Sequence, residues 1–301
     1  MFRRLAMVAM VVAASVVGAA GEGSAQTAEG FDVVGVNDLG ARGMNAGLAI
    51  VGDCGYVGSR SANQGTAILD LGEPAAPRVI GEIPLNPGST QREVRAVADL
   101  DVLIVLNYRL DLAGGGTNSL DLYDISDCAG PVFRSRVDFG EAMPHEFFLW
   151  RDPSSQRKGR VLAYVAMWGH APNLRVVDVG DPGHPTLVTT WDAAPVVGIA
   201  SRIHSLTVSP GGRRAYLADW DNGLMVLDTT ALARGQGDLT PKLLTPPAGW
   251  LDLPGGNVHS TVYVPERELV VTTQEIYGPG TCPYGQLHVV DVKDPAAPAL
   301  V

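Results

Sequence analysis

A short apolar segment that ends in an aspartate occurs five times along this chain of 301 residues. The clearest copy, residues 174–188, reads LRVVDVGDPGHPTLV. The five copies are centred on Asp70, Asp124, Asp178, Asp228 and Asp291. Successive aspartates are separated by 54, 54, 50 and 63 residues, a spacing typical of a repeat architecture. We therefore expect several copies of one structural unit.

Each unit contains four short apolar segments that predict strands. In the third unit these segments read EFFLW, VLAYVAMW, LRVVDV and TLVTTWD, and turn-forming residues separate them. The chain has 36 glycines and 21 prolines, and this abundance of turn formers between short segments is typical of an all-β protein. One unit of about 50–60 residues therefore predicts a four-stranded antiparallel blade.

The third strand of the unit is apolar on both of its faces. Leu174 and Val176 lie on one side of it, and Val177 and Val179 lie on the other. Strands that are buried on both faces have such continuous apolar sequences. A blade enclosed between two neighbours meets this requirement, so the repeat predicts a β-propeller. A flat solenoid or a two-sheet sandwich is the structural alternative, but a sandwich does not explain the repeat.

Three copies of the segment resemble a known repeat. LDLYDISD, LRVVDVGDP and LHVVDVKDP are similar to the LVIVD repeat of secreted and cell-surface β-propellers of bacteria and archaea. The resemblance covers essentially all of residues 31–301. It implies a propeller scaffold and no single activity.

The N-terminal segment predicts export. Two arginines precede an apolar run over residues 5–20, and small residues follow it, which is the pattern of a secretory signal peptide. We expect residues 1–25 to be the signal peptide and residues 26–301 to be the propeller domain. The exported chain would be secreted, periplasmic or attached to the cell surface, without membrane insertion. An uncleaved membrane anchor is the alternative.

The charge balance limits the partners. Without residues 1–25, which hold two of the 22 basic and one of the 32 acidic residues, the net charge is about −11. Like charge repels nucleic acids and anionic membrane surfaces, so we expect neither as a partner. A protein or a glycan is the partner class that remains.

The two ends of the chain suggest how the blades close. Residues 31–40, FDVVGVNDLG, look like a fourth strand without its first three, and the sequence stops just after the last aspartate-proline turn. We expect the N-terminal strand to complete the last blade and to close a ring of five blades. A truncated sequence from a larger ring is the alternative. The copy at Asp228 lacks the aspartate-proline turn, so a longer loop is expected there.

The cysteines permit one disulfide. Cys54 and Cys128 both lie in turns that the repeat places on the same side of the blades. A disulfide between them, with Cys282 left over, is one of the alternatives, and the sequence leaves the pairing of the three cysteines open. None of the three has the close spacing of a thiolate metal site.

The repeated aspartates are interpreted as structural. An aspartate before a turn commonly accepts hydrogen bonds from backbone amides of that turn, and proline restricts the backbone there. A calcium site is the alternative interpretation for these carboxylates.

Three histidines occupy one repeat position, at the start of the innermost strand. They occur in MPHEFF, RIHSLT and NVHSTV and are His145, His204 and His259. The equivalent positions in the first two units are predicted to be Asn45 and Arg95. A ring of polar side chains around a central channel follows from this alignment.

The second strands end in large side chains on the same side of the blades. Trp168 and Trp220 each follow a tyrosine by four residues, and their counterparts are roughly Arg60, Asn107 and Gln274, with Tyr108 and Glu275 nearby. The prediction is a funnel with imidazoles at its throat and aromatic and arginine side chains at its lip.

Two functions from different classes follow. In the first, the protein is a binding module whose ligand contacts the channel mouth, formed by His145, His204, His259, Arg95, Asn45, Trp168, Trp220, Arg60 and Glu275. Clustered tryptophan and arginine favour such contacts. In the second, His145, His204 and His259 hold copper, zinc or iron in an oxidoreductase or hydrolase. Glu146 and Asp219 would then be acid–base groups or would hold the metal ligands in place. Inter-blade hydrogen bonding by the histidines, in a purely structural scaffold, is a third interpretation.

Overall fold

The computed structural model describes residues 32–110, 115–154, 160–169, 171–198, 201–246, 251, 253, 257–276 and 285–301. The chain divides into two compact units, Met1–Val34 and Gly35–Val301, and the elements described below lie in the second. The signal-peptide prediction for residues 1–25 lies outside the described residues. Within the described ranges, no helix is long and apolar enough to span a membrane.

The described strands form five blades of four strands each. Blade 1 consists of β1 (Asn45–Val51), β2 (Cys54–Ser59), β3 (Thr66–Asp70) and β4 (Arg78–Ile83). Blade 2 consists of β5 (Ser89–Val97), β6 (Val102–Arg109), β7 (Ser119–Asp124) and β8 (Val132–Asp138). Blade 3 consists of β9 (Pro144–Arg151), β10 (Val161–Met167), β11 (Leu174–Asp178) and β12 (Thr186–Trp191).

The last two blades have shorter outer strands. Blade 4 consists of β13 (Ile203–Val208), β14 (Arg214–Asp219), β15 (Gly223–Asp228) and β16 (Lys242–Leu243). Blade 5 consists of β17 (Asn257–Val264), β18 (Leu269–Glu275), β19 (Leu287–Asp291) and β20 (Ala299–Leu300). The helical turns between strands are η1 (Leu39–Ala41), η2 (Ala98–Leu100), α1 (Ala194–Val197) and α2 (Thr230–Arg234).

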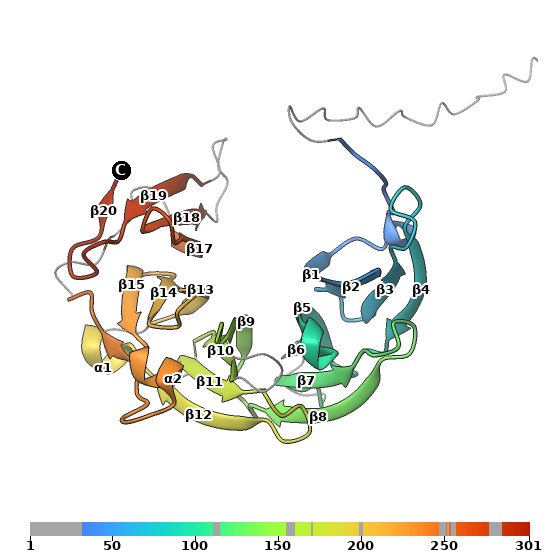
Figure 1. Cartoon of the computed structure of the whole chain (residues 1–301), viewed down its shortest axis with the longest axis horizontal. Helices are drawn as coiled ribbons and strands as arrows, with labels where there is room; N and C mark the ends of the chain where they lie inside the picture. Colours follow the sequence, from blue (N-terminus) through green and yellow to red (C-terminus); the bar gives the residue numbers. More distant parts are fainter. Residues whose placement is uncertain are drawn as a thin grey trace, which may run out of the picture. The chain divides into compact units, whose positions relative to one another are not determined.

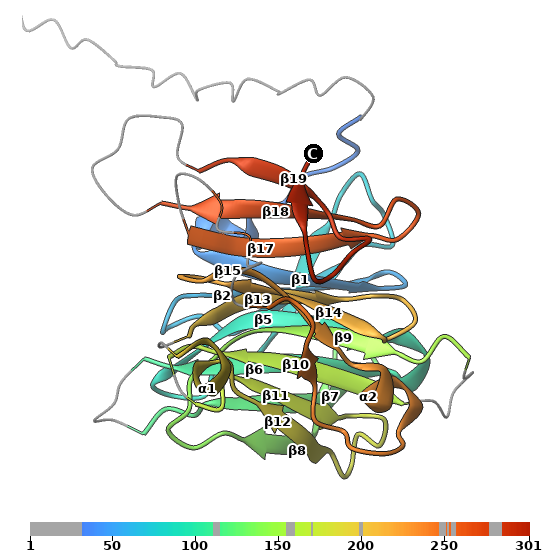
Figure 2. The same ribbon diagram turned by 90° about the vertical axis from the view of Figure 1, so that its left-hand side faces the viewer.

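Each blade is an antiparallel meander in which every strand pairs with the next along the chain. The first strands of consecutive blades lie side by side, and Figure 1 shows them on the inner side of the arrangement. Figure 2 shows β17, β18 and β19 of blade 5 as neighbours. The predicted all-β propeller of four-stranded blades is confirmed.

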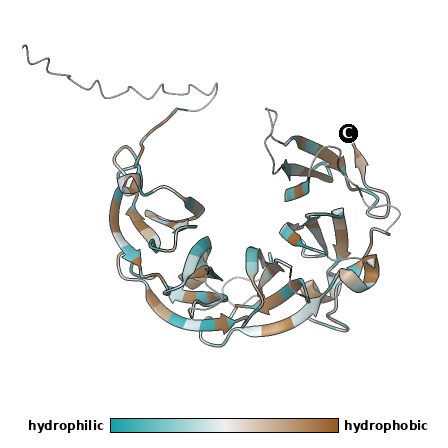
Figure 3. Cartoon of the chain, turned by 180° about the vertical axis from the view of Figure 1, so that it is seen from behind, coloured by the Kyte–Doolittle hydropathy of each residue, from teal (hydrophilic) through white to brown (hydrophobic). Residues whose placement is uncertain are grey.

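The blades are held together by apolar side chains that alternate between two neighbours. In β11, Leu174 and Val176 pack in the cluster shared with blade 4, whereas Val177 and Val179 pack in the cluster shared with blade 2. Hydrophobic residues accordingly run through the strands of the blades (Figure 3). Because both faces are buried, these strands lack the polar alternation of a one-sided sheet.

The repeated aspartates anchor the turns that follow the third strands. In each copy the side chain accepts a hydrogen bond from the backbone N–H two residues later, at distances of 2.8–2.9 Å. The pairs are Asp70 with Gly72, Asp124 with Ser126, Asp178 with Gly180, Asp228 with Thr230, and Asp291 with Lys293. The structural interpretation of these aspartates is confirmed. After Asp228 the expected longer connection contains α2 and leads to the short strand β16.

The predicted closure by the N-terminal segment is wrong. Residues 32–38 form no strand, and the Asn37 side-chain amide donates a hydrogen bond to the Pro77 carbonyl in blade 1. The fourth strand of blade 5 is β20, which pairs with β19. Because β20 already pairs with β19, the N-terminal segment is not the fourth strand of blade 5.

The outward sides of the two end blades remain apolar and exposed in the described part of the chain. Leu48 and Ile50 of β1 are 57% and 58% exposed, and Val262 of β17 is 61% exposed. The residue between Leu48 and Ile50, Ala49, is buried against blade 2. A blade needs a neighbour on each side to bury both faces, and these two blades have one described neighbour each.

A disulfide joins the first two blades. Cys54 begins β2, and Cys128 lies in the turn between β7 and β8, 74 positions further along the chain. Of the pairings that the sequence left open, this is the one that forms. Cys282 lies outside the described residues.

Replacing Cys54 and Cys128 with serine should lower the free energy of unfolding by about 2–4 kcal/mol, because the cross-link restricts a long loop of the unfolded chain. Denaturant titration of the variant and of the oxidised protein measures this difference. The reduced wild type is the matched control and should resemble the variant. Equal stability of oxidised and reduced protein would contradict the prediction.

Candidate functional site

A β-bulge interrupts each innermost strand at the same place. The ladder between first and second strands shifts register once in every blade. One residue of the first strand is left between the paired positions in blades 2 to 5, and two residues, Ala46 and Gly47, are left in blade 1, where Ala46 aligns with the single residue of the other blades. We call these the bulge residues, and they are Ala46, Arg92, His145, His204 and His259. A bulge re-aims a side chain relative to a regular strand. The predicted equivalence of the three histidines is confirmed.

The predicted equivalents in the first two blades are wrong. The register gives Ala46 in place of Asn45, and Arg92 in place of Arg95. Asn45 lies one residue before the bulge, is exposed, and accepts a hydrogen bond from the Arg42 guanidinium at 2.8 Å. Arg95 lies beyond the bulge and forms an ion pair with Glu93 at 3.0 Å. A bulge adds one residue to a strand, so residue positions assigned by counting along a regular strand are wrong beyond the bulge.

A second set of equivalent residues follows from the same ladders. In each blade, one residue of the second strand lies opposite the position two residues before the bulge residue. This residue lies within one position of the end of the second strand. We call these the strand-end residues, and they are Arg60, Tyr108, Trp168, Trp220 and Glu275. The alignment of the repeats correctly assigned Arg60, Trp168 and Trp220 to equivalent positions. Tyr108 and Glu275, each one residue after the expected Asn107 and Gln274, complete the set.

Within each of blades 2 to 5, the bulge residue contacts the strand-end residue. The Arg92 guanidinium lies 4.7 Å from the centre of the Tyr108 ring. The His145 and Trp168 rings stack at 4.9 Å, and the His204 and Trp220 rings stack at 5.2 Å. In blade 5, His259 Nε2 lies 3.4 Å from Glu275 Oε2. The two sets therefore form consecutive layers.

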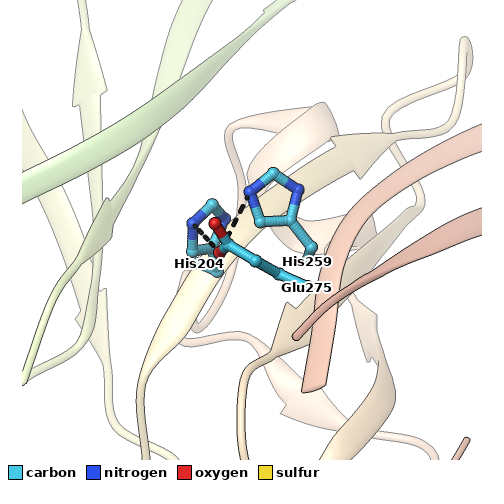
Figure 4. A group of neighbouring side chains, drawn as sticks. All are labelled: His204, His259 and Glu275. Carbon is cyan, nitrogen blue, oxygen red and sulfur yellow. Dashed lines mark ion pairs between the residues drawn. The ribbon is translucent and has the colours of Figure 1, made fainter. Parts of the chain in front are cut away.

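The histidines of three blades meet in one cluster. His145 Nε2 lies 2.9 Å from His204 Nε2, and the rings of His204 and His259 are 4.0 Å apart. Figure 4 shows His204, His259 and Glu275 pointing toward one another. One possible ligand atom from each of these three lies within 4.8 Å of the others. The predicted convergence of the imidazoles is confirmed as geometry, and Glu275 joins it.

Burial keeps the central imidazoles neutral. Burial and then the neighbouring His204 lower the pKa of His145 to about 2, and burial and then His259 lower the pKa of His204 to about 3. Burial also lowers the pKa of His259. Neutral imidazole carries an unprotonated nitrogen, so this cluster can accept a hydrogen bond or ligate a metal ion.

Carboxyl groups beside the cluster have raised pKa values. Burial, reinforced by Glu93, raises the pKa of Glu146 to about 7, and a hydrogen bond with Ser205 opposes that rise. Glu146 Oε1 lies 3.9 Å from His204 Nδ1. Burial also raises the pKa of Asp219, whose carboxylate contacts Ser201 and Asn222 within its own blade. Glu146 can therefore exchange a proton near neutral pH, whereas Asp219 supports the local turn.

The accessible part of the site differs from the predicted lip. Trp220 is only 7% exposed, because the Trp168 and His204 rings cover it. Arg60 is exposed, and Tyr108, Trp168 and Glu275 are partly exposed. The Arg202 guanidinium lies 5.9 Å from the Trp168 ring centre. A ligand at this surface would therefore meet Trp168 and the arginines before it meets Trp220.

The comparisons with known proteins support the fold. A sequence model of the LVIVD repeat matches residues 162–193 and 205–233, in blades 3 and 4. The crystal structure of the β-propeller domain of Cps50 (Swd1) from Myceliophteria thermophila is similar at a TM-score of 0.56 and 12% identity, covering 85% of this chain and 72% of that chain. KlAtg21 in complex with the coiled-coil of AgAtg16 gives a TM-score of 0.47 at 18% identity, covering 86% and 70%. No curated protein matches the chain.

These observations define a β-propeller. The matched repeats are more specific: the chain contains LVIVD repeats in blades 3 and 4. The resemblance of its repeated segments to LVIVD is thereby confirmed.

Replacing His204 with glutamine should reduce the loss of stability on acidification. The unfolded chain binds a proton at His204 below its ordinary pKa of 6.5, whereas the folded protein does so only near 3. The wild type therefore loses about 1.4 kcal/mol per pH unit from this group as the pH falls between these values. Urea titrations from pH 4.5 to 6.5 should show a smaller slope in the variant, and an unchanged slope would contradict this.

Replacing Glu146 with glutamine should change the pH dependence of stability in the opposite direction: the variant should lose less stability as the pH rises. The folded pKa of Glu146 is about 7 and its ordinary value is 4.5, so its contribution to stability is present below pH 4.5 and is lost as the pH rises through 7. Glutamine removes this contribution to the pH dependence, so the variant should lose less stability than the wild type between pH 4.5 and 7. The same urea titrations measure it, with the His204 variant as the comparison of opposite sign.

Proposed function

We propose that this LVIVD-repeat propeller binds a protein partner through the exposed strand-end residues, with Trp168 and Arg60 as the main contacts. The observation that supports this most is the register of the blades, which brings Arg60, Tyr108 and Trp168 from three different blades to equivalent positions. Tryptophan, tyrosine and arginine are the residues that most often carry binding energy at protein interfaces.

The chemistry of the surface suggests what the partner presents. Trp168 offers a partly exposed aromatic ring supported underneath by Trp220 and His145. No ion pair joins Arg60 to a carboxylate in the described residues, and Arg202 adds a second guanidinium near the Trp168 ring. A partner segment that combines a carboxylate with an apolar side chain matches this surface, because guanidinium binds carboxylate through paired hydrogen bonds.

We also propose that the protein acts outside the cytoplasm. The arginine-flanked apolar segment of residues 1–25 is typical of a signal peptide. The disulfide between Cys54 and Cys128 supports the same proposal, because such bonds persist mainly in oxidising compartments.

Metal-dependent oxidation or hydrolysis is the less favoured function. It would need a bound metal and a substrate, whereas partner binding requires only the surface and the scaffold described above.

Trp168→Ala and Arg60→Ala should each weaken partner binding by about 30-fold, the effect of losing a contact worth about 2 kcal/mol. Immobilised wild type and variants are incubated with extracts of the source organism, and captured proteins are quantified by mass spectrometry. Phe133→Ala is the matched control, because Phe133 is an exposed aromatic residue on the outer strand β8. Circular dichroism confirms folding of each variant.

A protein captured equally by wild type, Phe133→Ala, Trp168→Ala and Arg60→Ala does not use this surface. If every captured protein behaves in that way, the proposed function is wrong. A set of proteins retained by Phe133→Ala and depleted by the other two variants supports it.

A further inference from the structure

We propose that His204, His259 and Glu275 bind a divalent first-row transition metal ion, with His145 as an adjacent fourth donor. Glu275 Oε2 lies 3.4 Å from His259 Nε2 and 3.8 Å from His204 Nε2 (Figure 4). Two ligand atoms bound at about 2.1 Å to one tetrahedral ion are about 3.4 Å apart. The donors therefore need only a small inward movement to enclose one ion.

The carboxylate of Glu275 is suited to bind a cation. Glu275 Oε2 is buried and has no hydrogen-bond partner among the described residues. It faces two ring nitrogens at distances beyond a good hydrogen bond. A buried acceptor without a partner is costly, and in native proteins such a group often contacts a bound water or ion. A metal ion between the three side chains would satisfy it.

The ring orientations agree with metal ligation. His259 Nδ1 lies 2.8 Å from the Ser260 hydroxyl, and His204 Nδ1 lies on the side of Glu146. Both Nε2 atoms face Glu275. Metal-binding histidines are usually held in this manner, with one ring nitrogen near a polar neighbour and the other on the ion.

His145 approaches the same space from blade 3. Its Nε2 lies 2.9 Å from His204 Nε2, which is shorter than the separation of about 3.4 Å between two ligands of a tetrahedral ion, so the two rings would move slightly apart to bind one ion together. In the metal-free protein this contact is a hydrogen bond between the two imidazoles. Binding of an ion would replace that hydrogen bond by two bonds to the metal.

The site lies on strands rather than on loops. His204 and His259 occupy the bulges of β13 and β17, which lie side by side, and Glu275 is the last residue of β18. Ligands on rigid elements are held more accurately than ligands on loops. Imidazole and carboxylate donors together suit zinc or iron(II) and do not select the soft copper(I) ion.

The test measures metal bound to the purified full chain. Protein freed of metal by chelator is dialysed against Zn²⁺ alone, and bound zinc is counted by elemental analysis. One ion per chain is expected. His204→Gln, His259→Gln and Glu275→Gln should each weaken zinc binding at least tenfold. His184→Gln, which changes an exposed histidine in an outer turn, should keep one ion per chain.

A second measurement loads the wild-type protein with Co²⁺. Because it uses no variant, its result does not depend on whether the variants fold. The absorption spectrum of the cobalt-loaded wild type should show ligand-field bands of nitrogen and oxygen ligation without a thiolate charge-transfer band. Absence of stoichiometric zinc, zinc binding unchanged in all three variants, or a thiolate band would each overturn the proposal. Trp168→Ala should still bind one zinc ion, so failure of partner binding and failure of metal binding are separate results.

Discussion

Every other feature of this protein depends on the burial of both faces of a blade between its neighbours. In β6, Leu103 and Val105 pack toward blade 1, whereas Ile104 and Leu106 pack toward blade 3. Burial of each such side chain contributes about 1.5–3 kcal/mol. No blade has an apolar core of its own, so the consecutive stacking of blades is what makes the strands stable. The same requirement explains why the end strands β1 and β17 expose apolar side chains.

The stacking also creates the site. It brings the first strands of neighbouring blades together, so residues about 55 positions apart become contacts, as His145 and His204 do. The repeated bulge then turns one side chain per blade out of the regular alternation. The strand-end residues form the layer next to the bulge residues. The proposed metal site and the proposed partner surface are therefore consecutive layers of one structure, and Glu275 belongs to both.

The sequence predicted much of this site, and its errors have a common cause. The three histidines align because each has the same neighbours along its own strand, and Trp168 and Trp220 align for the same reason. Arg92 was missed because the first two blades have no histidine to guide the alignment, although RE followed by an apolar residue matches HE followed by an apolar residue in blade 3. The N-terminal segment was misplaced because β20, a strand of two residues, was too short to recognise.

The sequence by itself determined the blade, its four strands, its turn anchors and the shared position of the histidines. These are consequences of local periodicity and turn chemistry, which depend on residues close together in the chain. Only the tertiary structure decided that Trp220 is covered, that Glu275 meets two imidazoles and that Ala46 and Arg92 complete the set of bulge residues. Those facts depend on the rotation between blades and on one extra residue in a ladder, and neither leaves a periodic signal in the sequence.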